Sequence, residues 1–216
     1  MTRPAQLLDR RARRRRETIE EILEVAVEVM TEDGVAALSL AEVARRMGLR
    51  PPSLYQYFPS KAAIYNALFA QGARRVAAAA VEAEAAELDG ADPLARLRTF
   101  QDGFCRWCIE NPVLTQLLFW RTVPGFEPSP ESFAPAVAHL EELRSRLRAA
   151  VAAGQLAPQA ASEEAVALFT CLVSGVVAQQ FANEPDASYE QGRFTRLVPT
   201  VFDMFIARYA PKEHTS

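Results

Sequence analysis

The spacing of apolar residues is helical along almost the whole chain. Between Thr18 and Met30 the apolar positions recur in steps of three and four, which is the pattern of a helix with one buried face. Gly34 lies just beyond this segment and favours the end of the helix there. The sequence contains no convincing strand alternation and no repeat, so the pattern predicts an all-α protein.

Three short elements are expected after the first helix. Ser39 and Glu42 have the spacing of a capping box, in which Ser39 caps a helix over 40–48 and Glu42 reaches back to it. A Pro-Pro pair opens the next helix, over 51–58, because proline fits the first turn of a helix. A long fourth helix then begins at Lys61.

A larger helical bundle is expected behind these elements, which brings the total to about nine helices. The helices of the bundle are expected over about 61–89, 93–110, 112–122, 136–153, 163–182 and 190–209. The segment 124–135 holds four prolines and a glycine, so it is expected to be a loop.

The second and third helices have the pattern of a helix-turn-helix. Such a motif needs a small residue where the helices cross and a glycine for the tight turn, and Ala44 and Gly48 have this spacing. The apolar residues that would lock the two helices together are Val43, Met47, Leu49, Leu54 and Tyr57. A helical hairpin that binds no DNA shares this pattern, so the motif alone does not decide the function.

Charge is distributed unevenly along the chain. The formal net charge is −3, but residues 1–16 hold seven arginines and one aspartate, a net +6, which leaves −9 on residues 17–216. A basic arm on an acidic body is typical of a chain whose end meets a polyanion. Arms of this kind enter the minor groove of DNA in some proteins, although a solvated tail has the same composition. Arg14 and Arg15 are the candidate contacts.

The segments 38–44, 48–49 and 53–61 together resemble the DNA-binding domain of the TetR family of transcriptional regulators. The most specific part is Leu-Tyr-x-Tyr-Phe-x-x-Lys, which ends at Lys61. The resemblance extends over about 17–66, and the rest of the chain is similar to the family only in its pattern of helices.

The resemblance implies a role for each matching position. Ser39 and Lys61 would contact phosphates, and the exposed residues of the third helix would face the major groove and its backbone. Arg50 stands where the family often has a capping Ser or Thr, so it cannot cap in the usual way but could itself reach DNA. The candidate DNA-binding residues are Arg14, Arg15, Ser39, Arg50, Ser53, Tyr55, Gln56, Tyr57 and Lys61.

The resemblance also implies how the chain is organised. Residues 1–16 would form the basic arm, 17–66 the helix-turn-helix domain, and 67–216 a domain for ligand binding and dimerisation. It implies a cytoplasmic homodimer that binds a palindromic operator in double-stranded DNA and acts as a repressor released by a small-molecule effector. The alternative is a helical small-molecule-binding or scaffolding protein whose basic arm binds RNA or a membrane.

Two further sets of residues are assigned within 67–216. Aromatic residues are concentrated beside the proline-rich loop, where a pocket between helices could hold the effector. The candidate ligand-binding residues are Phe104, Trp107, Cys108, Trp120 and Phe169. Apolar stripes on the last two helices would leave an exposed patch on a lone subunit, which predicts a two-fold dimer. The candidate interface residues are Val166, Val173, Val177, Phe181, Val201 and Phe205.

Catalytic and metal chemistry find little support in the sequence. It contains no G-x-S-x-G, no H-E-x-x-H and no phosphate-binding glycine loop, so an enzyme is not expected. Cys105 and Cys108 form a C-x-x-C, but zinc needs four ligands and no second pair accompanies them, so neither metal nor cofactor is expected. Polar residues interrupt the uncharged stretch 165–183, which predicts a helix buried against a partner rather than a membrane span.

Overall fold

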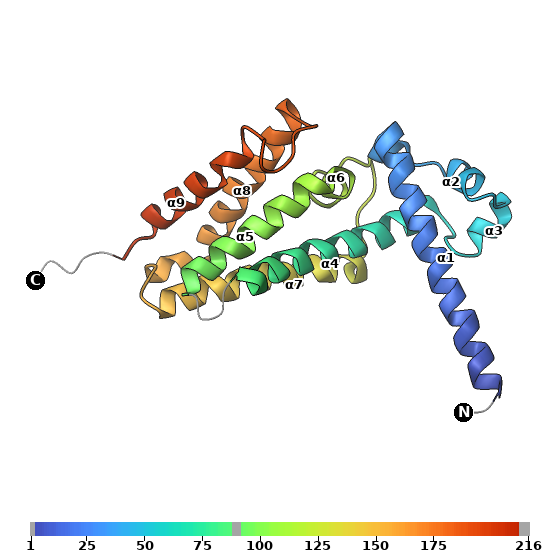
Figure 1. Ribbon diagram of the computed structural model, residues 1–216, viewed down its shortest axis with the longest axis horizontal. Helices are drawn as coiled ribbons and strands as arrows, with labels where there is room; N and C mark the ends of the chain where they lie inside the picture. Colours follow the sequence, from blue (N-terminus) through green and yellow to red (C-terminus); the bar gives the residue numbers. More distant parts are fainter. Residues whose placement is uncertain (1–2, 88–91, 212–216) are drawn as a thin grey trace, which may run out of the picture. The chain divides into compact units, whose positions relative to one another are not determined.

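The computed structural model describes residues 3–87 and 92–211, and this part of the chain consists of helices joined by turns and loops, without a strand (Figure 1). The all-α prediction is therefore confirmed. The α-helices are α1 (Arg3–Asp33), α2 (Leu40–Arg46), α3 (Pro51–Tyr55), α4 (Lys61–Glu87), α5 (Pro93–Glu110), α6 (Pro112–Phe119), α7 (Pro130–Ala152), α8 (Glu163–Asn183) and α9 (Val198–Arg208). Short 3₁₀ turns are η1 (Val35–Ala37), η2 (Pro158–Ala161) and η3 (Thr195–Leu197).

The helices form two compact units. The first unit comprises Met1–Gln71 and Val113–Ser132, and the second comprises Gly72–Pro112 and Phe133–Ser216. The helix α4 begins in the first unit and ends in the second, and most of α6 belongs to the first. The unit that contains the helix-turn-helix is therefore larger than the stretch 17–66 and is not continuous in sequence.

The core of the first unit is built on one face of α1. Ile22, Ala26 and Val29 have 0% exposed surface, and α1 packs against α2 and η1 while α2 packs against α3. Burying one such aliphatic side chain stabilises a fold by roughly 1.5–3 kcal/mol. The apolar stripe between Thr18 and Met30 is thus the surface on which the helix-turn-helix rests.

Residues 113–132 close the first unit over the start of α4. The ring of Phe126 lies 5.3 Å from the ring of Tyr65, and the backbone N–H of Ser129 donates to the side-chain oxygen of Asn66 at 2.7 Å. The hydroxyl of Tyr65 donates to the carbonyl of Val35 at 2.7 Å. Burial raises the pKa of Tyr65 to about 12, so this donor keeps its proton at any physiological pH.

Close packing of α5 against α4 organises the second unit. A Cβ added at Gly103 would lie 2.6 Å from the Cβ of Ala83 and 2.9 Å from the carbonyl oxygen of Ala79. Only glycine therefore permits this approach of the two helices, and the alanine-rich part of α4 supplies the flat surface opposite. Packing against α5 therefore explains the small residues Ala79, Ala80 and Ala83 of α4.

A buried carboxylate links three helices of the second unit. Glu84 of α4 is 5% exposed, accepts from Arg96 of α5 at 2.6 Å and also accepts from Arg146 of α7. Burial acts to raise the pKa of Glu84, but the hydrogen bonds from Arg146 and Arg96 outweigh it and the pKa is lowered. The carboxylate is thus ionised and paired, as a buried charge must be.

Several helix boundaries differ from those expected. The first helix begins at Arg3 and includes the basic arm, α6 ends at Phe119, and α7 begins at Pro130 inside the expected loop. Pro130 is the first residue of α7 and suits that position, while Pro135 lies in its second turn. A proline at this position lacks the backbone N–H and so removes only one hydrogen bond near the start of the helix. The helix therefore tolerates it.

The last helix also starts later than expected, at Val198 instead of residue 190. The side-chain oxygen of Gln180 accepts from the backbone N–H of Phe194 at 3.0 Å, and Thr195 donates its hydroxyl to the carbonyl of Tyr189 at 2.6 Å. These side chains hold residues 184–195 in a turn. Pro199, which is the second residue of α9, is the sequence signal that marks the true start.

The apolar stripe expected to lie exposed on α8 and α9 faces inward instead. Val166, Val173 and Val177 are 4–7% exposed and Phe205 is 1% exposed within the single chain, whereas Phe181 and Val201 are half-buried. For the four buried side chains the prediction of an exposed patch on a lone subunit is wrong, because they pack among α5, α8 and α9. By length and composition α8 is apolar enough to cross a membrane, as the core helix of a globular protein can also be.

The imidazole of His139 lies among aromatic rings in the second unit. It stacks on Phe100 at 5.2 Å and on Phe104 at 5.3 Å, and its Nδ1 is buried without a hydrogen-bond partner among the described residues. Burial, and next the positive charge of Arg146, lower the pKa of His139 to about 4. The side chain is therefore neutral at physiological pH.

The neutral state of His139 predicts a pH-dependent stability. The pKa is lower in the folded state than its usual 6.5, so the unfolded chain binds the proton first as the pH falls. The stability is fully present above pH 6.5 and declines between pH 6.5 and about 4, by at most about 1.4 kcal/mol per pH unit. We expect His139→Leu to flatten this part of the profile, measured by urea unfolding at a series of pH values. An equally steep profile in His139→Leu would contradict the assignment.

Candidate nucleic-acid interface

The helix-turn-helix is closed by the turn that the sequence predicts. Gly48 has a φ of 64°, a conformation that glycine adopts without steric cost. The backbone N–H of Leu49 donates to the carbonyl of Ala44 at 2.9 Å. Val43 and Ala44 are 0% exposed and Leu54 is 1% exposed. The two helices are therefore locked against each other at the small residue and the glycine.

The capping box is only half formed. Ser39 accepts from the backbone N–H of Glu42 at 3.3 Å, as expected. The carboxylate of Glu42, however, accepts from Arg45 and Arg46 at 2.7–2.8 Å and does not reach back to Ser39. Arg46 also donates twice to Glu32 at the end of α1, at 2.7 and 2.8 Å. The hydrogen bonds from Arg45, and next those from Arg46, lower the pKa of Glu42 to about 2. Through its bonds to Glu42 and Glu32, Arg46 links α2 to α1.

The third helix presents its polar residues outward. Tyr55 is 51% exposed and Gln56 is exposed, while Ser53 and Tyr57 are half-buried. Phe58 is buried and belongs to the core. The side chains that α3 leaves accessible are therefore a phenol, an amide and a hydroxyl, which hydrogen-bond to phosphates or base edges.

The start of α3 has no side-chain cap. Arg50 occupies the N-cap position without a capping hydrogen bond and is exposed. Two prolines fill the first helical positions, where a missing N–H costs nothing. The Arg50 side chain is accordingly available to a ligand at the N-terminal end of α3.

Lys61 begins α4 and already has internal contacts. Its ammonium donates to the carbonyl of Ala36 at 2.7 Å and lies 5.5 Å from the centre of the Tyr65 ring. Lysine has three donors, so two N–H bonds can still serve a phosphate. Ser60 caps this helix, because its side-chain oxygen accepts from the backbone N–H of Ala63 at 3.2 Å.

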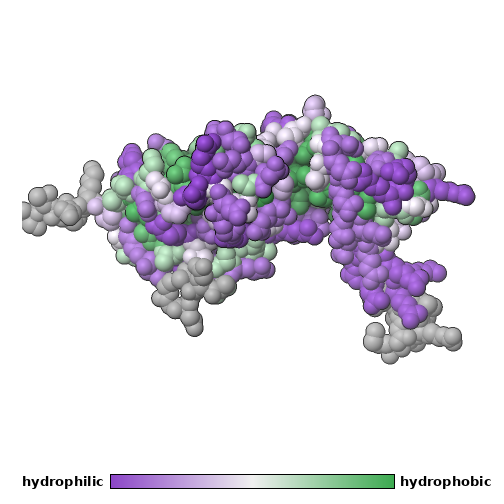
Figure 2. Space-filling view, turned by 45° about the horizontal axis from the view of Figure 1, so that its top comes forward, coloured by the Kyte–Doolittle hydropathy of each residue, from purple (hydrophilic) through white to green (hydrophobic). Residues whose placement is uncertain are grey.

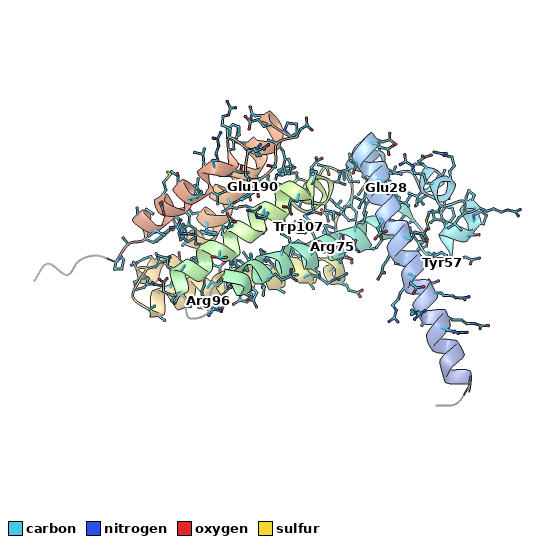
Figure 3. The ribbon with its side chains drawn as sticks, viewed as in Figure 1. Glu28, Tyr57, Arg75, Arg96, Trp107 and Glu190 are labelled. Carbon is cyan, nitrogen blue, oxygen red and sulfur yellow. The ribbon has the colours of Figure 1, made fainter. Side chains whose placement is uncertain are left out.

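Arg15 contacts the end of the third helix. Its guanidinium donates to the carbonyl of Gln56 at 3.2 Å and lies 5.0 Å from the centre of the Tyr57 ring; Tyr57 is labelled beside α1 in Figure 3. Arg14 is exposed. The structure thus brings Arg15 together with Gln56 and Tyr57, a juxtaposition that residues 41 positions apart do not reveal in the sequence.

The candidate ligand-binding residues are divided between several surroundings. Phe104, Trp107 and Cys108 lie on α5, where Phe104 stacks on His139 and the other two are buried. Phe169 of α8 meets the rings of Phe202 and Phe205 edge-on, at 6.1 and 5.0 Å. Trp120 follows α6 and belongs to the first unit. Sequence reasoning did not select His139, because an isolated histidine in a helix gives no signal of a binding role.

A small cavity lies beside Phe169. It has a volume of about 10 Å³, which is close to the space that one water molecule needs, and its wall includes Phe169, Val176 and Phe202. Residues of α5, α8 and α9 enclose it. A ligand larger than water would have to displace these side chains.

The C-x-x-C pair belongs to the packed interior. Cys105 and Cys108 are both 0% exposed, and burial raises the pKa of the Cys105 thiol to about 12. A thiol with such a pKa is not a reactive thiolate. Among the described residues there is no group of three or more His, Cys, Asp or Glu side chains that could hold a metal ion.

Comparison with known proteins identifies the helix-turn-helix region. Residues 22–68 match the sequence profile described as bacterial regulatory proteins, tetR family. No curated protein matches the chain. The matched region contains α2, α3 and the start of α4, so it covers the candidate interface except Arg14 and Arg15, which precede it.

Solved structures share the fold over nearly the whole chain. The TetR family transcriptional regulator PfmR from Thermus thermophilus is 24% identical, with 86% of this chain and 97% of that one covered and a TM-score of 0.61. A TetR family transcription regulator from Marinobacter aquaeolei VT8 is 20% identical, with 92% and 100% covered and a TM-score of 0.66. RolR, in complex with resorcinol, is 14% identical, with 93% and 91% covered and a TM-score of 0.59. At these identities the likeness establishes the fold.

Proposed function

Because the chain belongs, through residues 22–68, to the tetR family of bacterial regulatory proteins, we propose that it is a repressor that a small molecule releases from a palindromic operator. The observation that carries the proposal is that α3 is anchored in the core on one side and exposes polar side chains on the other. Leu54 is buried and anchors the helix, while Tyr55 on the same helix is 51% exposed. A solvent-exposed phenol on a short, rigidly anchored helix has no packing role and suits contact with DNA in the cytoplasm.

The DNA-facing surface is proposed to combine several sequence regions. Arg50, Tyr55 and Gln56 are exposed on or beside α3, and Lys61 begins α4 with two N–H donors to spare. Ser39, at the start of α2, is half-buried, and its hydroxyl oxygen accepts the capping hydrogen bond. Its hydroxyl hydrogen remains available to a phosphate.

The first test is the loss of the exposed phenol. Tyr55→Ala should weaken binding to a duplex that carries the promoter of the protein's own gene by roughly tenfold to a hundredfold, since a specific contact contributes about 1–3 kcal/mol. Tyr55→Phe keeps the ring and separates stacking from hydrogen bonding. Gel-shift titration measures the affinity, and thermal unfolding confirms that both variants fold. Wild-type affinity in Tyr55→Ala would exclude this face as the reading surface.

A homodimer is proposed to form through the outer face of α8. Most of the exposed or half-buried positions on this face are small: Ala167, Cys171, Ser174, Gly175, Ala178 and Ala182. Leu168, which is 37% exposed, lies two helical turns before Gly175 on the same side of α8. A Cβ added at Gly175 would meet nothing within 4 Å in its own chain, yet glycine inside a helix costs roughly 1 kcal/mol relative to alanine. A second helix packed closely at this point supplies the reason for the glycine. Large apolar side chains are also exposed on or beside the neighbouring α9, Leu197 at 46% and Met204 at 60%.

The dimer is tested on this outer face, since Val177 is buried within the subunit and a charge there would unfold it. Gly175→Arg should yield monomers that fold normally but lose operator binding, because a large charged side chain blocks the approach of the partner helix. Ala78→Arg, at an exposed position of α4, is the matched control and should remain dimeric. Light scattering at micromolar concentration gives the oligomeric state. A dimeric Gly175→Arg would move the interface to another surface.

The effector is proposed to bind in the second unit beside Phe104 and Trp107. The unpartnered Nδ1 of His139 next to Phe104 offers one hydrogen bond within an aromatic setting. The fold relative RolR was solved with resorcinol, which supports a small molecule as the class of effector. The single helix α4 runs from Lys61 into the second unit and provides a route for coupling. The coupling is reciprocal, so an effector that weakens operator binding is itself bound more weakly in the presence of operator.

The third test concerns this proposed effector site. A variant Trp107→Phe should bind the promoter duplex as the wild type does but need a higher effector concentration for release, because the substitution changes only the proposed effector site. A phenylalanine is preferred to alanine because Trp107 is 8% exposed and full truncation costs about 3–5 kcal/mol. Native mass spectrometry of the purified protein identifies a retained effector for the titration. Unaltered sensitivity of the variant to that effector would exclude Trp107 from the effector site.

A further inference from the structure

The first helix continues well beyond the helix-turn-helix core. It runs without interruption from Arg3 to Asp33, and the residues 10–17 are all exposed. In Figure 1 this part of α1 projects past α3, and Figure 2 shows it as strongly hydrophilic. The arginines of the basic arm are therefore carried by a helix.

The side of α1 that faces the core is apolar where it packs against the helix-turn-helix and basic in the part that projects from it. Ile22 and Ala26 lie on the buried face, and Arg15 and Arg11 follow on the same face at helical spacing, seven and eleven residues before Ile22. The stripe that is apolar beneath the helix-turn-helix thus becomes basic beyond it.

Arg15 fixes the direction of the projecting helix relative to α3. Its hydrogen bond to the carbonyl of Gln56 satisfies one of the free carbonyls at the end of α3, and its guanidinium lies against the Tyr57 ring. One turn further out, Arg11 is displaced from Arg15 by about 6 Å along the helix axis. Because the helix is continuous, Arg11 has a fixed place on the projecting part of α1, one turn past the residue that contacts α3.

The positive charge of this segment is largely uncompensated. Arg13 pairs with Glu17 at 3.2 Å. Within the part of the chain that the structure describes, no ion pair involves Arg10, Arg11, Arg14 or Arg16. Four guanidinium groups of this kind over about 9 Å of helix fit a polyanion with regularly spaced phosphates.

We propose that residues 10–16 of α1 form a rigid helical surface that binds the phosphates edging the groove entered by α3, with Arg15 as the positioning residue. The proposal rests on the proposed function, because α3 determines which polyanion is near. The major groove is about 12 Å wide, so a helix within side-chain reach of the end of α3 meets the backbone at its edge. This mode differs from a flexible arm that inserts into the minor groove, which needs no helix.

The experiment separates the helix from its charge. The full-length protein is titrated with a duplex of about 40 bp and arbitrary sequence at several salt concentrations, so that no operator needs to be known. Ala12→Pro keeps every arginine but disrupts the helix on the N-terminal side of residue 12, where Arg10 and Arg11 lie. Ala12→Gln is the matched control. The proposal predicts that Ala12→Pro makes the negative slope of log K against log salt shallower by about 1.8, because Arg10 and Arg11 lose one phosphate contact each. Ala12→Gln should keep the wild-type slope, and Arg11→Ala should make it shallower by about 0.9.

Other results overturn the proposal. A wild-type slope in Ala12→Pro together with a reduced slope in Arg11→Ala would establish a flexible arm. Wild-type slopes in both variants would show that the segment does not touch DNA, and tight binding to anionic phosphatidylserine vesicles with unchanged DNA slopes would assign it to a membrane. In each of these cases Tyr55→Ala still tests the proposed function on the promoter duplex, so the two failures are distinguishable.

Discussion

The burial of one face of α1 is the constraint on which the DNA-binding unit depends. Of the three fully buried side chains Ile22, Ala26 and Val29, the larger two contribute roughly 1.5–3 kcal/mol each, whereas an exposed ion pair contributes at most about 1 kcal/mol. The Glu32–Arg46–Glu42 network adds a polar link between α1 and α2 to this apolar contact. Because α2 rests on this face and α3 rests on α2, the accessible phenol of Tyr55 and the position of Arg15 both follow from the register of α1.

Local features of this unit were predictable from the sequence because short-range geometry determines them. The stripe of α1, the cap at Ser39 and the turn at Gly48 each depend on residues within one or two turns of helix. The links that tie the unit together join distant residues, such as Arg46 with Glu32 or Arg15 with Gln56, and pattern alone does not predict them. Arginine is also a good helix former, so the basic arm continues α1 although its composition is that of a tail.

The prediction that the bulky stripe of α8 lies exposed on a lone subunit failed for a different reason. The helix is apolar on nearly all sides, so helical spacing cannot tell its inner face from its outer one. The bulky stripe of Val166, Val173 and Val177 was the natural choice for an interface, but bulky side chains fill the interior of their own subunit. The small residues around Gly175 lie on the outer face. A hydrophobic pattern does not single them out, whereas the structure shows that they form a surface on which a second helix could pack closely. Proline has the same ambiguity in α7, since Pro130 begins the helix although a cluster of prolines suggests a loop.

The closure of the first unit by residues 113–132 has a consequence for how such proteins can be recombined. The rings of Tyr65 and Phe126 and the bond between Asn66 and Ser129 join the start of α4 to a stretch that lies far along the sequence. A chimera that exchanges only residues 1–66 would cut α4 in its second turn and leave Phe126 and Ser129 facing foreign partners. The DNA-reading part is thus not a module in sequence, and a transplant that preserves its contacts has to carry both stretches.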